Sequence, residues 1–223
     1  MDTIKTVGES KQKRENTPLS PRRGNLFVFT GPSGVGKGTI CKQLLAGVTG
    51  LRKSISVTTR NQRPGEEDGV NYFFRTVEQF EQMRAANQLM ESAEFAGSYY
   101  GTPKQWVIEQ LDLGFDVILE IEVQGAKQVM QRLPEAVLVF VSPPSFEDLR
   151  ARLVGRGTET PEKIALRLSK AQQEMRERHL FHYEVVNDNV EHAVLNLAHI
   201  VYAERCRIRQ STSESHDEHN QNP

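Results

Sequence analysis

The sequence predicts an α/β fold, with a doubly wound parallel sheet covered by helices on both faces. Two observations support this prediction. Short apolar, β-rich runs alternate with longer helical patterns through the middle of the chain, and a glycine-rich turn joins the first run to the first helix. This alternation is typical of parallel strands joined by crossover helices. No repeat of 20–50 residues is visible, so we expect one domain, over residues 24–209.

Four apolar runs are expected to form the buried strands of this sheet: Leu26–Thr30, Val117–Ile121, Ala136–Val141 and Tyr183–Asn187. Seven helical patterns accompany them. The first starts at Gly36, the next two cover Thr76–Ala86 and Pro103–Leu113, and the fourth follows Gln124. The last three start near Ser145, at Thr160–Pro161 and at Val190, and the final one runs to about Arg209. Thr160 suits a helix N-cap and Pro161 a first turn.

Composition and charge exclude several classes of protein. The 223 residues include 28 Lys and Arg against 29 Asp and Glu, a net charge of −1, which argues against a broadly basic nucleic-acid-binding protein. No apolar run approaches the ~18 residues that span a membrane. The two cysteines have no metal-like spacing, which suits a reducing compartment. We therefore expect a cytoplasmic protein without nucleic-acid or membrane partners.

The two ends of the chain differ from the middle. Residues 1–23 contain four hydrophobic residues and residues 210–223 contain none, so we expect both to be disordered tails. The first segment lacks the apolar region of a secretory signal, and Asp2, Glu9 and Glu15 argue against a transit peptide.

The glycine-rich turn is the first candidate functional site. A strand, a glycine-rich turn and a helix follow one another, which is the context of a nucleotide phosphate-binding loop. Backbone N–H groups and the helix N-terminus would surround the phosphates, and Lys37 would reach the β- and γ-phosphates. The expected ATP-binding residues are Gly31, Pro32, Ser33, Gly34, Val35, Gly36, Lys37, Gly38 and Thr39.

One position departs from the usual loop sequence. Gly38 stands where a Ser or Thr hydroxyl usually binds Mg²⁺, and Thr39 is one position late. No metal ligand is therefore assigned with certainty. We expect Mg²⁺ to be held mainly by phosphates and water, near Glu120 or Glu122 at an acidic strand end. These two residues alternate in the strand sequence VILEIEV, so we expect both to lie on one strand and to face the same side of the sheet.

A second phosphate site is predicted downstream. Arg60 and Arg63 lie three residues apart beside a Pro-Gly turn, where their guanidinium groups could clamp a phosphate. Tyr72 and Tyr100 supply phenol donors nearby. Glu91 by itself is more readily interpreted as a surface acid.

At this point the sequence resembles the guanylate kinase family. The motifs GPSGVGK, SVTTRNQRPGE with Tyr72, EFAGSYYGT, LEIEVQGA, PPS, RLVGRGTET and VVND follow one another in the family's order, over roughly residues 24–205. The resemblance implies a P-loop enzyme that transfers the γ-phosphoryl group of ATP to GMP or dGMP in purine nucleotide metabolism, with Mg²⁺. It also implies a GMP-binding segment at about 54–103 and a mobile, arginine-bearing lid at about 143–170.

The resemblance assigns roles residue by residue. It places Arg60, Arg63, Tyr72 and Tyr100 at the GMP phosphate, Ser56, Glu91 and Thr102 at the guanine, and Asn187 at the adenine side of ATP. Lys37, Arg152, Arg156 and Arg167 are the implied catalytic cations around the ATP phosphates. Glu122 replaces the family's usual Asp, which leaves open whether it contacts guanine directly or acts through the metal's water shell. We interpret Lys170 as an ordinary solvated charge.

Two alternative functions remain at this stage. The oligomeric state is also open, between monomer and homodimer. Adenylate kinase, a kinase of other base specificity, also has GKGT after its glycines but lacks TTRNQRPGE and SYYGT. Guanylate-kinase-like modules that bind phosphorylated peptides lose the ATP-side residues, whereas Lys37, Arg152, Arg156 and Arg167 are all present here.

Overall fold

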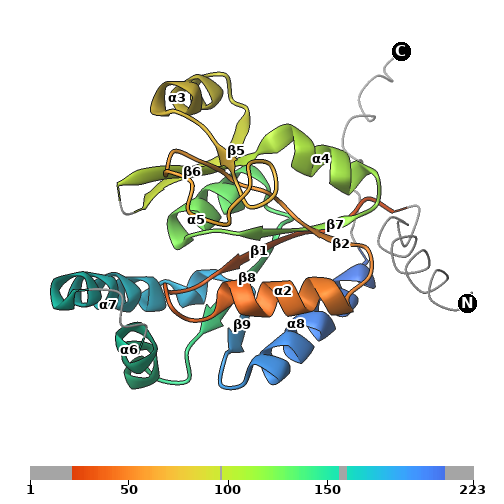
Figure 1. Ribbon diagram of the computed structural model, residues 1–223. Coiled ribbons are helices and arrows are strands. Elements are labelled where there is room, and N and C mark those ends of the chain that lie inside the picture. Colours follow the sequence, from red (N-terminus) through yellow and green to blue (C-terminus); the bar gives the residue numbers. More distant parts are fainter. Residues whose placement is uncertain (1–21, 96, 156–159, 209–223) are drawn as a thin grey trace, which may run out of the picture.

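A computed structural model describes residues 22–95, 97–155 and 160–208 (Figure 1). Its central sheet has five parallel strands in the order β2-β7-β1-β8-β9. The strands are β1 (Leu26–Thr30), β2 (Leu51–Lys53), β7 (Asp116–Glu120), β8 (Val137–Ser142) and β9 (Tyr183–Val186). The predicted α/β fold with a parallel sheet is confirmed, and the four predicted strands are present with ends shifted by one residue at most. Both predicted tails lie mostly outside the described residues.

Helices cover both faces of this sheet (Figure 1). The helices α2 (Lys37–Gly47) and α8 (Val190–Arg205) pack on one face, and α4 (Lys104–Asp112) and α5 (Val123–Arg132) pack on the other. Because side chains alternate along a strand, Phe27 and Phe29 of β1 join the first core, whereas Leu26 and Val28 join the second. The sheet is therefore doubly wound. The last helix ends at Arg205 rather than near Arg209.

A second, smaller sheet lies beyond α5 and was not predicted. Its strand order is β4-β3-β6-β5, with β3 (Val57–Thr58), β4 (Phe73–Phe74), β5 (Leu89–Phe95) and β6 (Ser98–Pro103). The strand β6 pairs antiparallel with β3 and β5, and β3 pairs parallel with β4. The helix α3 (Val77–Ala85) packs on this sheet through Phe80 and begins at a Thr76 capping box.

Two further helices, α6 (Phe146–Val154) and α7 (Pro161–Arg176), lie together at one end of the molecule (Figure 1). They share a small core of Leu149, Leu153 and Ala171, which is separate from the two cores of the central sheet. A short 3₁₀ turn, Arg178–Leu180, follows α7. Thr160 caps α7 and Pro161 occupies its first turn, as predicted. Within the described residues, no helix is long and apolar enough to cross a membrane.

Candidate active site

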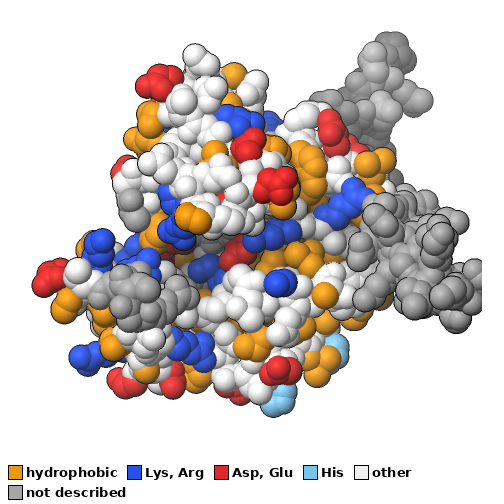
Figure 2. Space-filling view, in the orientation of Figure 1, with side chains coloured by type: hydrophobic (Ala, Val, Ile, Leu, Met, Phe, Trp, Pro, Cys, Tyr) orange, Lys and Arg blue, Asp and Glu red, His pale blue; other side chains and the backbone are white. Residues whose placement is uncertain are grey.

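A cavity of about 440 Å³ lies between the carboxyl ends of the central strands and the second sheet. This is the size of a small-molecule site, and the place in an open α/β sheet where ligands bind. Lys and Arg side chains gather along the groove between the two parts of the molecule (Figure 2). Ten of the predicted residues line the cavity: Lys37, Ser56, Arg60, Arg63, Tyr72, Glu91, Tyr100, Glu120, Glu122 and Arg167.

The phosphate-binding loop connects β1 to α2 on one side of the cavity. Gly31, Gly34 and Gly36 have φ angles of 143°, 92° and 98°, which L-residues with a side chain rarely adopt. A Cβ at Gly31 would also lie 2.1 Å from the carbonyl oxygen of Val141. No side chain caps the start of α2, so its first N–H groups are placed for an anion. Lys37 Nζ donates to the carbonyl of Gly31 at 2.5 Å.

Two of the predicted ATP-side residues support this loop from behind. Asn187 is buried, and its Nδ2 donates to the Val35 carbonyl at 2.6 Å. Arg152 donates to the carbonyls of Val35 at 3.3 Å and Asn187 at 2.9 Å. Neither residue lines the cavity. Their contacts hold the loop backbone, and a direct contact with ATP remains a prediction. Arg156 lies outside the described residues.

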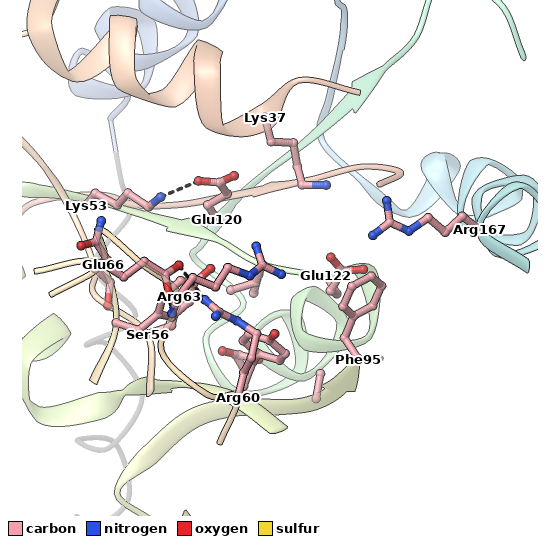
Figure 3. Close-up of a pocket in the computed structure, with 17 residues that line it drawn as sticks. Lys37, Lys53, Ser56, Arg60, Arg63, Glu66, Phe95, Glu120, Glu122 and Arg167 are labelled. Carbon is pink, nitrogen blue, oxygen red and sulfur yellow. Dashed lines mark hydrogen bonds and ion pairs between the residues drawn. The ribbon is translucent and has the colours of Figure 1, made fainter. Parts of the chain in front are cut away.

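The predicted clamp for the acceptor phosphate is organised by a carboxylate that the sequence argument left unassigned. Glu66 accepts two hydrogen bonds from Arg60, at 2.7 and 3.0 Å, and one from the Arg63 backbone N–H at 2.8 Å. The hydrogen bonds from Arg60 hold the pKa of Glu66 below its usual range. The Arg60 guanidinium also lies 5.4 Å from the Tyr72 ring. Figure 3 shows the Arg63 side chain extending into the cavity.

Glu91 lines the cavity and is not a surface acid, because only 3% of it is exposed. It projects from β5 and accepts a hydrogen bond from the buried Thr102 hydroxyl at 2.7 Å. Burial raises the pKa of Glu91 to about 7. Gly125 of α5 makes room for this carboxylate, since a Cβ there would lie 2.4 Å from Oε2. Such a carboxylate can accept two adjacent N–H donors from a ligand.

Two more carboxylates lie between the phosphate loop and the acceptor clamp. Glu120 ends β7, and Glu122 is the residue before α5, so the expectation that both belong to one strand is wrong although both line the cavity. Lys53 Nζ lies 2.5 Å from Glu120 Oε2, and Figure 3 shows this pair beside Lys37. Lys170 Nζ lies 3.1 Å from Glu122 Oε2. Lys170, which we interpreted as an ordinary solvated charge, keeps 38% of its side chain exposed but also forms this ion pair.

The chemistry of these groups suits a magnesium ion shared with phosphates. In the described part of the chain, no cluster of three His, Cys, Asp or Glu side chains could hold a metal by itself. Glu120 Oε1, however, lies only 3.5 Å from the position of a Cβ on Gly38, at the start of α2. Mg²⁺ commonly binds one or two carboxylates together with substrate phosphates and water. The residues present fit that mode.

Sequence reasoning missed four of the residues that organise the cavity: Lys53, Glu66, Phe95 and Lys170. Glu66 lies within the RPGE motif and Lys53 directly precedes the acceptor segment, so position along the chain was a usable signal for both. Phe95 lies within the EFAGSYYGT motif and so carried the same signal, whereas Lys170 lies in none of the motifs. They meet only through the packing of elements that are 75 residues apart in the sequence.

Comparisons with known proteins agree with the resemblance seen in the sequence. The profile of the guanylate kinase family matches residues 23–204. A guanylate kinase of Lactococcus lactis is 52% identical over 186 residues, covering 83% of this chain and 91% of that protein. One of Halalkalibacterium halodurans is 49% identical over 198 residues, covering 89% and 97%. The crystal structure of guanylate kinase from Anaplasma phagocytophilum superimposes with a TM-score of 0.70 at 31% identity, covering 83% and 88%.

Proposed function

The chain belongs to the guanylate kinase family and is an enzyme that phosphorylates GMP with ATP; we propose that it does so in the cavity described above. One observation supports this location most strongly. The same cavity is lined both by Lys37 of the phosphate-binding loop and by the buried Glu91, which Thr102 hydrogen-bonds. The phosphates of the donor nucleotide and the nucleobase of the acceptor can therefore bind at separate places in one site. Neither an adenylate kinase nor a phosphopeptide-binding module is favoured by the named relatives.

The donor side of the site is proposed to hold ATP by its phosphates. The loop Gly31–Thr39 surrounds them with backbone N–H groups, and Lys37 leaves its loop carbonyls to contact them. Arg167 of α7 reaches the same cavity from the other side (Figure 3). Arg152 and Asn187 support the loop, and Arg156 is proposed to add a further charge. The acceptor phosphate is already anionic, so the main barrier is repulsion between two polyanions.

The acceptor side is proposed to hold GMP, and dGMP by the same contacts. Arg60, Arg63, Tyr72 and Tyr100 surround its phosphate. Guanine presents N1–H and the 2-amino group as adjacent donors, and the Glu91 carboxylate accepts both. Thr102 orients that carboxylate and Ser56 lies on the cavity wall. Adenine has an unprotonated N1 and no 2-amino group, so it would leave Glu91 buried and unpaired.

Magnesium is proposed as the cofactor. Glu120, held by Lys53, and Glu122, held by Lys170, are the residues that would bind the ion or its water molecules. When bound, the ion neutralises phosphate charge. The residues of the chain align the two phosphates and exclude water, so that the phosphoryl group passes to GMP instead of to water.

The wider assignments are proposals of the same kind. We propose a cytoplasmic enzyme of purine nucleotide metabolism, with ATP and GMP as its partners and neither nucleic acid nor membrane. The catalytic domain is placed at residues 24–209, with a lid at about 143–170. The oligomeric state is left between monomer and homodimer.

A coupled ADP-release assay with GMP, dGMP, AMP and UMP tests this proposal. GMP and dGMP should be used, and AMP should be at least about 10³-fold poorer in kcat/KM. Arg63→Ala should raise the KM for GMP about 100-fold and leave the KM for ATP within about two-fold, because its guanidinium serves the acceptor phosphate. Arg75→Ala is the matched control, since Arg75 lies in the same segment but does not line the cavity. Equal use of AMP and GMP would refute the proposed base recognition.

A further inference from the structure

The side chain of Lys170 connects three elements that belong to different sides of the site. It projects from α7 and lies 3.1 Å from Glu122 Oε2, at the start of α5. Its Nζ also lies 4.1 Å from the centre of the Phe95 ring, at the end of β5 in the second sheet. Phe95, Glu122 and Arg167 gather at one side of the cavity (Figure 3). Lys170 thus spans the junction between the donor-side helix and the acceptor-side sheet.

Polar contacts join the helix that carries Lys170 to the rest of the molecule. The small core of α6 and α7 is separate from the cores of the central sheet. An ion pair between Lys127 and Glu177 ties the far end of α7 to α5, and Lys170 ties its middle to Glu122. Arg167 lies one turn before Lys170 on the same helix. A contact that fixes Lys170 therefore also fixes the direction from which Arg167 enters the cavity.

The charges around Lys170 make it more than a surface ion pair. Glu174, one turn further along α7, is 6% exposed and lies 3.7 Å from Lys170 Nζ. Glu122 Oε2 lies 3.1 Å from the same Nζ. Lys170 is the cation between these two carboxylates. Without it, Glu122 would lose the ion pair that fixes its position in the cavity wall.

We propose that Lys170 is a positioning residue that couples the two nucleotide sites. It holds Glu122 and Phe95 on the acceptor side and thereby fixes the approach of Arg167 to the donor phosphates. This inference rests on the proposed function, which places ATP near Arg167 and GMP near Glu122. Each nucleotide should then strengthen the binding of the other by the same factor, since coupling between two ligands is reciprocal.

Isothermal titration calorimetry on the full chain measures this coupling. The Kd for GMP is determined with and without a saturating, non-hydrolysable ATP analogue and Mg²⁺, and the ratio of the two values is the coupling factor. We expect a factor of about 10 in the wild type, within the usual range for coupled sites. Lys170→Met should reduce it to about 2 or less, and Lys170→Arg should retain most of it because the cation is kept.

Two further variants separate this role from general effects on the helix. Lys163→Met removes an exposed lysine of the same helix, two turns earlier, and should leave the coupling factor unchanged. Phe95→Leu removes the aromatic face next to Lys170 but keeps apolar bulk, so it should lower the coupling factor. This variant tests the inference even if Lys170→Met does not fold.

The possible outcomes distinguish the inference from the function on which it rests. If Lys170→Met and Phe95→Leu retain the wild-type factor, the inference is wrong. It is also wrong if the wild type shows no coupling, or if Lys170→Met weakens GMP binding equally with and without the analogue. If the wild type binds no GMP, the proposed function itself fails. Loss of coupling in Lys170→Met and Phe95→Leu, with the factor kept in Lys163→Met, supports the inference.

Discussion

The donor and acceptor sides of the cavity are built in different ways. The donor side is a backbone structure, in which three glycines with positive φ form a loop between β1, whose five residues are all buried, and α2. The acceptor side is built from side chains of a small sheet and of the irregular segment between β3 and β4. Val57, Phe80 and Leu89 form the buried core beneath them. The phosphates of all nucleotides are alike, so backbone N–H groups and cations can bind them whatever the base is. Discrimination of a base requires side chains whose hydrogen bonds match one pattern.

Lys37→Met tests the donor side and should give the largest effect. It removes a cation from the transferring phosphoryl group, so kcat should fall about 10³-fold, or about 4 kcal/mol. Because the lysine bonds only to its own loop in the described structure, the melting temperature should change little. Steady-state kinetics and thermal melts measure both. Near-normal turnover would show that the loop does not hold the reacting phosphates.

Glu91→Gln tests the acceptor side. The change turns one acceptor oxygen into a donor and sets an NH₂ group against a guanine N–H, so kcat/KM for GMP should fall about 100-fold. The KM for ATP should stay within about two-fold, and the preference for GMP over AMP should narrow. Kinetics with both monophosphates measure this. Unchanged GMP kinetics would mean that guanine is recognised by other residues.

Gly125→Ala tests whether the space around Glu91 matters. The new Cβ would lie 2.4 Å from Glu91 Oε2, so the carboxylate must move, and the KM for GMP should rise about 10-fold. Gly47→Ala is the matched control, since a Cβ at that helical position meets nothing within 4 Å. A normal KM for GMP in Gly125→Ala would show that Glu91 can shift without cost to recognition.

The same carboxylate predicts a pH dependence of stability. The pKa of Glu91 is about 7 in the folded protein against 4.5 as its ordinary value. The folded state therefore binds a proton between these values that the unfolded state has lost, and stability falls as pH rises from about 4.5 to 7. Glu91→Gln has no such titrating group, so it should avoid this loss of unfolding free energy, which amounts to at most about 3 kcal/mol.

Thermal melts of Glu91→Gln and wild type from pH 5 to pH 8 measure the effect. The difference in melting temperature should grow in favour of the variant up to pH 7 and then level, reaching several degrees. A difference that is independent of pH would contradict the assigned burial of a titrating carboxylate.

Gly38→Ser should give the smallest effect, in contrast to the same change at Gly36. A Cβ at Gly38 would lie 3.5 Å from Glu120 Oε1, an ordinary contact, so activity should stay within about three-fold, and less Mg²⁺ should be needed. Gly36→Ser should be severe, because Gly36 has φ +98° and its Cβ would lie 2.7 Å from Asn187 Nδ2. Magnesium titrations of both variants test this contrast, and inactivation by Gly38→Ser would contradict it.

The sequence determined four of the five strands of the central sheet, its helices and the phosphate loop; the edge strand β2 was not predicted. Leu26–Thr30 and Val137–Ser142 are continuous apolar runs, and Thr160-Pro161 begins a helix by local chemistry alone. These features depend on neighbours in the chain, which the sequence shows directly. The identity of Glu91 as a candidate came from a family motif, and its surface-acid alternative could not be dismissed from the residues around it.

Only the tertiary structure decided how the charges of the site are paired and buried. The strands β3 and β4 have two residues each, too short for a periodic signal, yet they position the acceptor segment. The burial of Glu91 depends on α5 and Gly125, and the role of Lys170 depends on Glu122 and Phe95, which reach it from other elements. The pairing and burial of a charged group are set by residues distant in the chain, and no local pattern of one sequence reports which of them it will meet.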